Sequence, residues 1–174
     1  MGENLSTRRS APGAGVDDGL GIPVQAVRGV HDPRRLGELV AQSRAVLVNM
    51  KPSVIKKLGL TYDTLRKHND RIVCVAITGF GLDGGDYPAF DYVIQAATGV
   101  AAMTGDPDDP PTLPGYSSAD NSTALTAALG LLAMIVSGDG GQVDVSLRDV
   151  MLSQLNYKAS AYLKIGRASC RERV

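Results

Sequence analysis

The sequence predicts an α/β fold in which a parallel sheet carries helices on its faces. Two continuous apolar runs, 45–48 and 71–78, are typical of strands that are buried on both faces. Segments with helix caps and helical periodicity precede, separate and follow these runs, as they do in parallel α/β proteins. The 20 glycines among 174 residues favour short, tight connections between such elements.

Local signals set the expected bounds of each element. Asp32 and Pro33 open the first helix as N-cap and first helical residue, and Gly59 ends the second helix. Small residues along the longest helix predict close packing against another helix, and they are Ala124, Ala127, Ala128 and Gly130. In chain order we expect helix 34–43, strand 45–48, helices 52–57 and 62–67, strand 71–78, helix 89–98, a long helix from Asp120 to Val136, strand 142–146 and a final helix at 147–163.

Composition excludes several classes of function. Hydrophobic residues make up 44% of the chain and charged residues 21%, which suits a packed domain rather than global disorder. The formal net charge is zero and no basic stripe is present, so we expect no nucleic-acid partner. No apolar run approaches the roughly 20 residues of a membrane span, and no secretory signal opens the chain. We therefore expect no membrane partner and a cytoplasmic location.

The two ends of the chain differ from its middle. Residues 1–30 are rich in Gly, Arg, Ser and Asp without any period, so we expect an irregular or disordered segment that could be non-native. Residues 165–174 match the conceptual translation of a common sequencing adapter, and we expect them to be an artefact tail. The expected partial domain therefore spans 31–164, in a natural chain that continues beyond it.

Cysteine and histidine predict no metal site. Cys74 lies in the second apolar run, where a buried strand thiol is the ordinary interpretation and a reactive thiol the alternative. Cys170 lies in the tail, which leaves one cysteine and no disulfide in the remainder. His31 and His68 are isolated in sequence, lack metal-ligand spacing, and are expected at the surface.

The segment 79–84 matches the G-x-G-x-x-G pattern of dinucleotide-binding loops and follows a predicted strand. That pattern requires its third glycine to lead into a helix, but Gly85, Asp86 and Pro88 follow and break a helix. Asp83 and Asp86 also repel a pyrophosphate. We therefore favour an ordinary loop over a nucleotide site.

Asp120 is the most informative acidic residue. It stands between 117–119 and a long apolar helix, and its spacing alone favours a helix N-cap. A carboxylate near a helix N-terminus is also kept ionised by the helix dipole and nearby N–H groups. Those N–H groups could hold an oxyanion, and aspartate can act as a covalent nucleophile. The spacing is compatible with both roles.

Two further segments carry weaker signals. Asp91 lies one turn into its expected helix, where it complements the helix dipole in the ordinary interpretation. The segment 49–52 leaves the carboxyl end of a strand, where ligands collect in parallel sheets, although a plain strand-to-helix turn also explains it. Lys51, Lys56 and Lys57 add positive charge there, which suits a phosphorylated ligand but is also common on surfaces.

Taken together, several segments resemble CoA-transferase family III, also called the CaiB/BaiF family, over roughly residues 36–163. Each segment is modest alone, and their order along the chain makes the resemblance specific. The segments are 46–52, 58–60 with 62, 69 with 71–73, 77–81, 88–91, 95–99, 120–123 and 141–149.

This resemblance implies an acyl-CoA:carboxylate CoA-transferase whose partners are an acyl-CoA and a free carboxylic acid. It implies that Asp120 attacks the donor thioester to form an acyl-aspartyl anhydride, and that the returning CoA thiolate gives an aspartyl-CoA thioester. Asp91 matches an acid beside the reacting thioester, so both acids are expected catalytic residues. The resemblance implies no metal, and coenzyme A contacts at Asn49, Met50, Lys57, Leu58, Pro88 and Ala89.

The family fold is a Rossmann-like large domain with a small domain, in two chains that interlock as a homodimer. The family's first strand and helix are not recognisable in 1–30, so we expect part of the large domain. A truncated, non-catalytic fragment is one alternative. Another is an acyl-CoA racemase of the same superfamily, but Phe90 replaces the histidine that such racemases use and cannot exchange a proton. Ala124 replaces a usual glycine, and its methyl group could crowd the acyl group or the helix start.

Overall fold

The computed structural model describes residues 33–106 and 108–165, and from Gly37 onward these belong to one compact unit, which is the unit described below. The predictions for residues 1–30, Asp32, His31, Cys170 and the tail after 165 lie outside the described residues. The elements are α1 (Pro33–Ala41), β1 (Ala45–Asn49), α2 (Pro52–Lys57), α3 (Tyr62–Leu65), β2 (Val73–Thr78), α4 (Asp91–Ala97), α5 (Val100–Met103), α6 (Ser118–Ser137), β3 (Gly141–Ser146), α7 (Leu147–Gln154) and α8 (Tyr157–Ile165).

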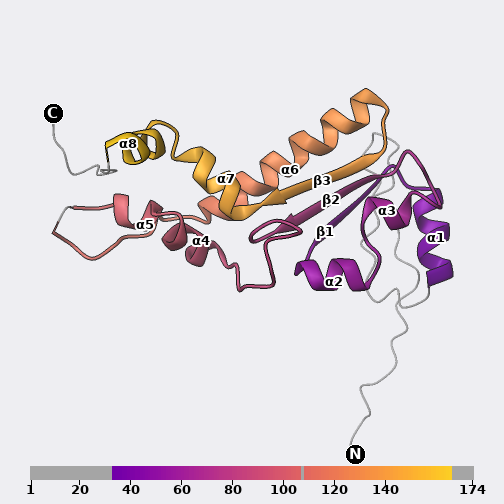
Figure 1. Ribbon diagram of the computed structural model, residues 1–174, viewed down its shortest axis with the longest axis horizontal. Helices are drawn as coiled ribbons and strands as arrows, with labels where there is room; N and C mark the ends of the chain where they lie inside the picture. Colours follow the sequence, from indigo (N-terminus) through magenta and orange to yellow (C-terminus); the bar gives the residue numbers. More distant parts are fainter. Residues whose placement is uncertain (1–32, 107, 166–174) are drawn as a thin grey trace, which may run out of the picture. The chain divides into compact units, whose positions relative to one another are not determined.

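The three strands form a parallel sheet in the order β1-β2-β3 (Figure 1). Ala45 of β1 pairs with Val73 of β2, and Val73 pairs with Gly141 of β3. Because all three strands run the same way, their carboxyl ends meet at one edge of the sheet. The predicted α/β class with a parallel sheet is confirmed.

Side chains alternate between two faces of the sheet, with α6 along one face and α2 on the other (Figure 1). The expected burial of β1 on both faces is wrong, because Leu47 exposes 54% of its surface. The first face packs valines of β2 and β3 against α6 and α7, in a cluster of Val73, Val75, Ala127, Val145 and Val150. The second face packs β1 and β2 against α2 through Val48, Ile55 and Ala76. Residues from Val73 to Ala76 each expose 2% or less of their surface, which explains why the sequence of β2 is a continuous apolar run.

α6 approaches the sheet closely through small residues. Ala127 is fully buried among valines of the sheet and of α7, and a Cβ atom at Gly130 would lie 2.8 Å from a methyl carbon of Val143. Ala124 and Ala128 are exposed. The predicted packing against another helix is therefore partly right, since Ala127 packs against Val150 of α7, whereas Gly130 approaches Val143 of β3.

α6 is 20 residues long and apolar enough to cross a membrane by length and composition, and no other helix in the described ranges is. The expectation that no apolar run approaches this length is therefore wrong. Only 17% of its apolar stretch is buried, because a row of large side chains remains exposed: Leu125, Leu129, Leu132 and Val136. Length and composition do not separate a membrane span from a helix that packs on a sheet, and α6 contacts β2, β3 and α7.

Two helices differ from the sequence prediction for local reasons. The expected single helix at 147–163 is divided, because α7 ends at Gln154 and Asn156 takes a φ of 49° before α8 begins. Asparagine tolerates this left-handed conformation better than most residues. The short helix α5 was not predicted, and Gly99, with a φ of 85°, separates it from α4.

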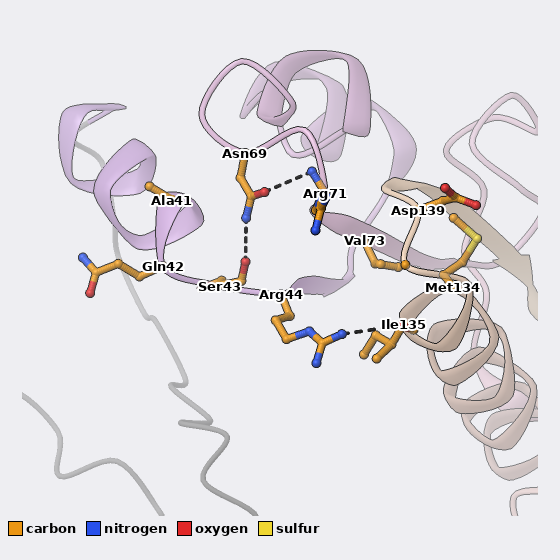
Figure 2. A pocket seen from close by; sticks show the side chains of 11 residues that line it. Ala41, Gln42, Ser43, Arg44, Asn69, Arg71, Val73, Met134, Ile135 and Asp139 are labelled. Carbon is orange, nitrogen blue, oxygen red and sulfur yellow. Dashed lines mark hydrogen bonds between the residues drawn. The ribbon is translucent and has the colours of Figure 1, made fainter.

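Asn69 joins the end of α1 to the start of β2 at the amino edge of the sheet (Figure 2). Its Nδ2 donates to the carbonyls of Val40 at 3.2 Å and Ser43 at 2.8 Å, and its Oδ1 accepts the Arg71 N–H at 3.0 Å. The amide therefore uses both donors and its acceptor within the protein. A cavity of about 380 Å³ lies beside Asn69, and none of the expected site residues lines it.

Candidate active site

A cavity of about 630 Å³ opens at the carboxyl edge of the sheet. The turn after β1, the loop between β2 and α4, and the first turns of α6 and α7 all contribute to its lining. Parallel sheets form ligand sites at this edge because strands end and helices begin there.

Asp120 lines this cavity from the first turn of α6. The helix begins at Ser118 with Ser117 as its N-cap, so Asp120 is not the N-cap that its spacing favoured. Burial raises the pKa of the Asp120 carboxyl, and the neighbouring charge of Asp91 raises it further. The carboxyl therefore keeps its proton more readily than an ordinary aspartate, which is the opposite of what a first-turn position alone predicts.

Asp91 is the first residue of α4 and connects this helix to α6. Its Oδ2 accepts the backbone N–H of Asp120 at 3.0 Å, and its Oδ1 accepts a hydrogen bond from Gln95 Nε2. Asp91 is not among the lining residues of the cavity, so it meets Asp120 through the backbone rather than from the ligand side. The two expected catalytic acids are thus neighbours.

The first-turn amides of α6 that were expected to hold an oxyanion have partners of their own. The amide of Asp120 donates to Asp91, and the amide of Asn121 donates to the Ser117 carbonyl at 3.0 Å. Both groups are therefore engaged within the protein and stabilise the start of the helix.

Four of the six residues expected to contact coenzyme A line the cavity, namely Asn49, Met50, Pro88 and Ala89. Lys57 and Leu58 do not line it, because they lie at the carboxyl-terminal end of α2, where both are exposed. Lys51 lies in the turn after β1 and brings a positive charge to the lining.

Several lining residues were not among the expected site residues, although Phe90 was named as the replacement for a racemase histidine. Tyr87 and Phe90 line the cavity and expose 68% and 62% of their surfaces, and Thr123 and Leu147 line it from α6 and α7. Tyr87 directly precedes the matching segment 88–91, and Thr123 lies inside 120–123, so both were within reach of the pattern. Gln95 lies in the matching segment 95–99, but only its contact with Asp91 gives it a role.

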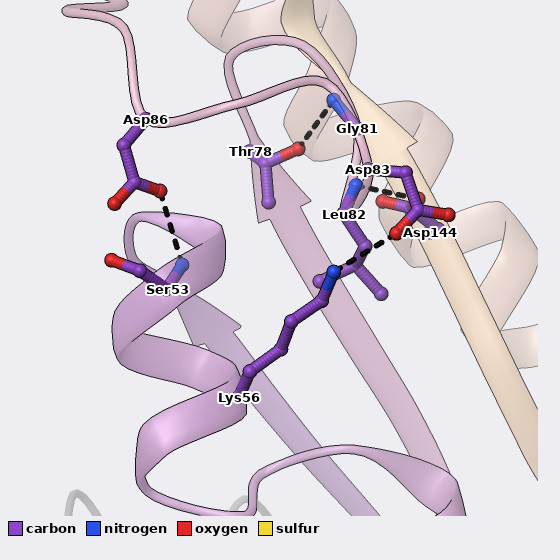
Figure 3. Close-up of polar contacts among 8 residues, drawn as sticks. All are labelled: Ser53, Lys56, Thr78, Gly81, Leu82, Asp83, Asp86 and Asp144. Carbon is purple, nitrogen blue, oxygen red and sulfur yellow. Dashed lines mark hydrogen bonds and ion pairs between the residues drawn. The ribbon is translucent and has the colours of Figure 1, made fainter.

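The glycine-rich loop after β2 is anchored to α2 by two acids (Figure 3). Asp83 pairs with Lys56 Nζ at 2.9 Å, and Asp86 Oδ1 accepts the Ser53 N–H at 3.0 Å. Hydrogen bonding to Ser53 lowers the pKa of the Asp86 carboxyl. Asp83 and Asp86, whose charges disfavour a pyrophosphate, therefore hold the loop against α2.

The same loop is anchored on its other side by β2 and β3 (Figure 3). The Gly81 N–H donates to Thr78 Oγ1 at 2.8 Å, and the Leu82 N–H donates to Asp144 Oδ2 at 2.9 Å. Gly79 must lack a side chain because a Cβ atom there would collide with Ala89. The glycines thus allow close backbone approach beside the cavity, and no helix follows them directly.

Cys74 and His68 both lie within the described residues. Cys74 is buried in β2, which confirms the expected buried strand thiol, and burial raises its thiol pKa to about 11. His68 is exposed, as expected. Within 33–106 and 108–165, no three or more His, Cys, Asp or Glu side chains gather in a group that could hold a metal ion.

A parallel α/β sheet with an acid-bearing cavity at its carboxyl edge defines a class of ligand-binding α/β proteins. The sequence model of CoA-transferase family III matches residues 30–173, and the chain belongs to this family.

Curated relatives with named activities are similar to this chain. Succinate–glutarate CoA-transferase of Agrobacterium fabrum is 33% identical over 139 residues, which cover 76% of this chain and 35% of the relative. Acetyl-CoA:oxalate CoA-transferase of Acetobacter aceti is 33% identical over 141 residues, covering 77% of this chain and 36% of the relative. The chain therefore spans about a third of the length of these relatives.

Solved structures agree with the fold assignment. A CaiB/BaiF family protein from Brucella suis has a TM-score of 0.72 and 30% identity, over 79% of this chain and 38% of that chain. A Mycobacterium tuberculosis protein has a TM-score of 0.67 over 75% of this chain and 38% of that one, at 24% identity, and this likeness concerns the fold alone. The Rossmann-like partial domain expected from the sequence is thus confirmed.

Proposed function

We propose that this chain carries the nucleophile-bearing part of an acyl-CoA:carboxylate CoA-transferase in which Asp120 is the covalent nucleophile. The observation that carries the proposal is the position of Asp120, which projects from the start of α6 into a cavity shared with Asn49 and Met50. Membership of CoA-transferase family III supports the same chemistry.

The proposed reaction exchanges a carboxylate for a thioester in balanced steps. The ionised Asp120 carboxylate attacks the thioester carbonyl, the C–S bond breaks, and an acyl-aspartyl anhydride and a CoA thiolate result. The thiolate then attacks the aspartyl carbonyl, which releases the donor acid and leaves an aspartyl-CoA thioester. The acceptor carboxylate repeats these two exchanges in reverse, which regenerates the Asp120 carboxylate and releases the new acyl-CoA.

The raised pKa of Asp120 fits a nucleophile of this kind. A carboxylate that is harder to ionise is more basic, and a more basic oxygen attacks a carbonyl more readily once its proton is lost. Asp91 contributes by holding the backbone of Asp120 and by placing a second negative charge beside it.

Coenzyme A is proposed to enter along the turn after β1. Asn49 and Met50 offer polar and apolar surface to its adenine end, and the Lys51 ammonium group suits its phosphates. Pro88 and Ala89 line the same cavity as Asp120 and are proposed to contact coenzyme A there. Lys57 and Leu58 stay proposed contacts outside the cavity lining.

The acceptor is proposed to be a small free carboxylic acid. Named relatives act on succinate, glutarate, oxalate and mesaconate, which are all dicarboxylates. The racemase alternative has less support, because Phe90 stands at the cavity where proton exchange needs a base. An interlocked homodimer, a cytoplasmic location, and the absence of nucleic acid or membrane partners remain part of this proposal.

The test of the nucleophile uses the enzyme that contains this segment. Asp120→Asn keeps the shape of the side chain but removes its nucleophilic oxygen, so transfer should fall at least about a thousandfold. Hydroxylamine should trap an aspartyl hydroxamate at this position in the unaltered enzyme and not in the variant. Asp149→Asn is the matched control, because Asp149 is also a first-turn aspartate but pairs with Arg148 outside the cavity. Transfer that survives Asp120→Asn unchanged contradicts the proposal.

A further inference from the structure

Gln95 is a buried polar side chain to which the proposed reaction assigns no role. It exposes 1% of its surface, and its Nε2 donates to Asp91 Oδ1. It lies one helical turn after Asp91, which places both side chains on the same face of α4. A buried amide opposes folding unless hydrogen bonds compensate its lost hydration, so this contact has to be accounted for.

The amide of Gln95 begins a series of contacts that ends at Asp120. It fixes one oxygen of Asp91, and the other oxygen accepts the Asp120 N–H at 3.0 Å. The Asp91 carboxylate is therefore held by two donors, one from α4 and one from α6. If Asp91 rotated, the first turn of α6 would lose the group that holds its backbone.

The second atom of the Gln95 amide supports the same role. Gln95 Oε1 is buried without a hydrogen-bond partner, and so is Ser118 Oγ at the first residue of α6. A buried amide with one unsatisfied end costs stability that an apolar side chain of similar size would not, so packing alone does not explain a glutamine here. Here the donor end meets a carboxylate, and only a donor can do so while Asp91 is ionised.

We propose that Gln95 is a positioning residue for CoA transfer, which orients Asp91 so that Asp91 holds the Asp120 backbone and directs the Asp120 carboxyl into the cavity. This inference rests on the proposed function of Asp120 as nucleophile. Gln95 acts through Asp91 and does not itself line the cavity.

Removal of Gln95 should change the ionisation of Asp120 through Asp91. The charge of Asp91, in its present orientation, adds to burial in raising the Asp120 pKa. The other titratable side chains in the cavity lining and on α4 and α7 are Lys51, Tyr87, Tyr92, Arg148 and Asp149. Asp91, which is not one of these five, is the charged group that contributes to the raised pKa of Asp120.

Two isosteric variants separate positioning from packing. Gln95→Met keeps the volume but cannot donate, so kcat should fall about tenfold or more while KM for acyl-CoA stays within about twofold. Gln95→Glu donates to Asp91 only while its new carboxyl is protonated, so its activity should fall as pH rises through the titration of that carboxyl. The control is Thr98→Val, which removes a buried hydrogen bond to the Ile94 carbonyl on the same helix. It should leave kcat and the pH profile unchanged.

A second readout does not need turnover. In a carboxyl-carbon NMR titration of the 174-residue chain, Gln95→Met should lower the pKa of Asp120 toward its usual range. An unchanged kcat and Asp120 pKa in Gln95→Met overturn the inference, as does an equal change in Thr98→Val. If Gln95→Met does not fold, the pH profile of Gln95→Glu decides instead. If Asp120→Asn keeps full transfer, the proposed function fails while the titration still reports whether Gln95 orients Asp91.

Discussion

The Asp120 carboxyl keeps its proton to a higher pH than an ordinary aspartate, because burial and the charge of Asp91 oppose its ionisation. Since the pKa is raised by folding, the ionised form is less favourable in the folded chain than in the unfolded one. The group therefore contributes stability at low pH that is lost as pH rises through the raised pKa. A proposed catalytic group here lowers the stability of the protein that carries it.

This linkage predicts how the stability of the Asp120→Asn variant, relative to the unaltered chain, changes with pH. The neutral amide cannot ionise, so the variant should gain in Tm relative to the unaltered chain as pH increases from about 4 to about 7. The measurement is thermal unfolding followed by circular dichroism across that range. A variant that becomes relatively less stable toward neutral pH would contradict the sign.

Ala124 follows Asp120 by one helical turn and lines the same cavity. Ala124→Gly removes a methyl group beside the proposed acyl site, so bulkier acyl donors should gain in kcat/KM relative to acetyl-CoA by up to roughly tenfold. The glycine should also lower the free energy of unfolding by about 1 kcal/mol, because it weakens the helix. A donor series assayed on both forms checks the first effect, and a uniform change across donors would argue against crowding.

At the scale of single elements, Asn69 holds the end of α1 and the start of β2 together. Asn69→Ala removes the hydrogen bonds that join its amide to the carbonyls of Val40 and Ser43 and to the Arg71 N–H, so the free energy of unfolding should fall by about 1–3 kcal/mol. Urea denaturation measures this loss. Gln42→Ala is the control, because its exposed amide donates to the Glu38 carbonyl on the same helix, and it should change stability little. Equal effects would mean that Asn69 does not act as this link.

The strand β2 was predictable from sequence because burial on both faces leaves an uninterrupted apolar run. The start of α6 was not, since Ser117 makes no side-chain capping bond and Asp120 resembles a cap by spacing. The break after α7 depends on the left-handed backbone of Asn156, which the apolar pattern does not signal. Asp120 and the turn after β1 were found by family pattern, whereas the role of Gln95 depends on a contact between α4 and α6.

At the scale of the whole molecule, the most prominent feature of the described chain is the exposed apolar row on α6. Leu125, Leu129, Leu132 and Val136 expose between 56% and 85% of their surfaces. Contiguous apolar surface of this kind promotes association in water. The chain spans about a third of its relatives' length, so such a surface need not be exposed in a longer enzyme.

This row predicts concentration-dependent association of the 174-residue chain. The double variant Leu129→Gln and Leu132→Gln should shift the chain toward monomer in light scattering after size exclusion, because it interrupts the apolar surface. Leu163→Gln is the control, since Leu163 is exposed at 82% but lies on α8, away from the row. Association that is unchanged by the double variant would show that another surface is responsible.

The buried thiol of Cys74 has a practical consequence. It lies on the central strand and on the same face as Ala76, which packs against α2, so a thiol reagent can reach it only after the elements that cover this face have moved away from the sheet. In a chain with Cys170→Ser, the rate at which Cys74 is labelled therefore measures how often the core of the protein opens. No label has to be added to the core, because the thiol of Cys74 is already there.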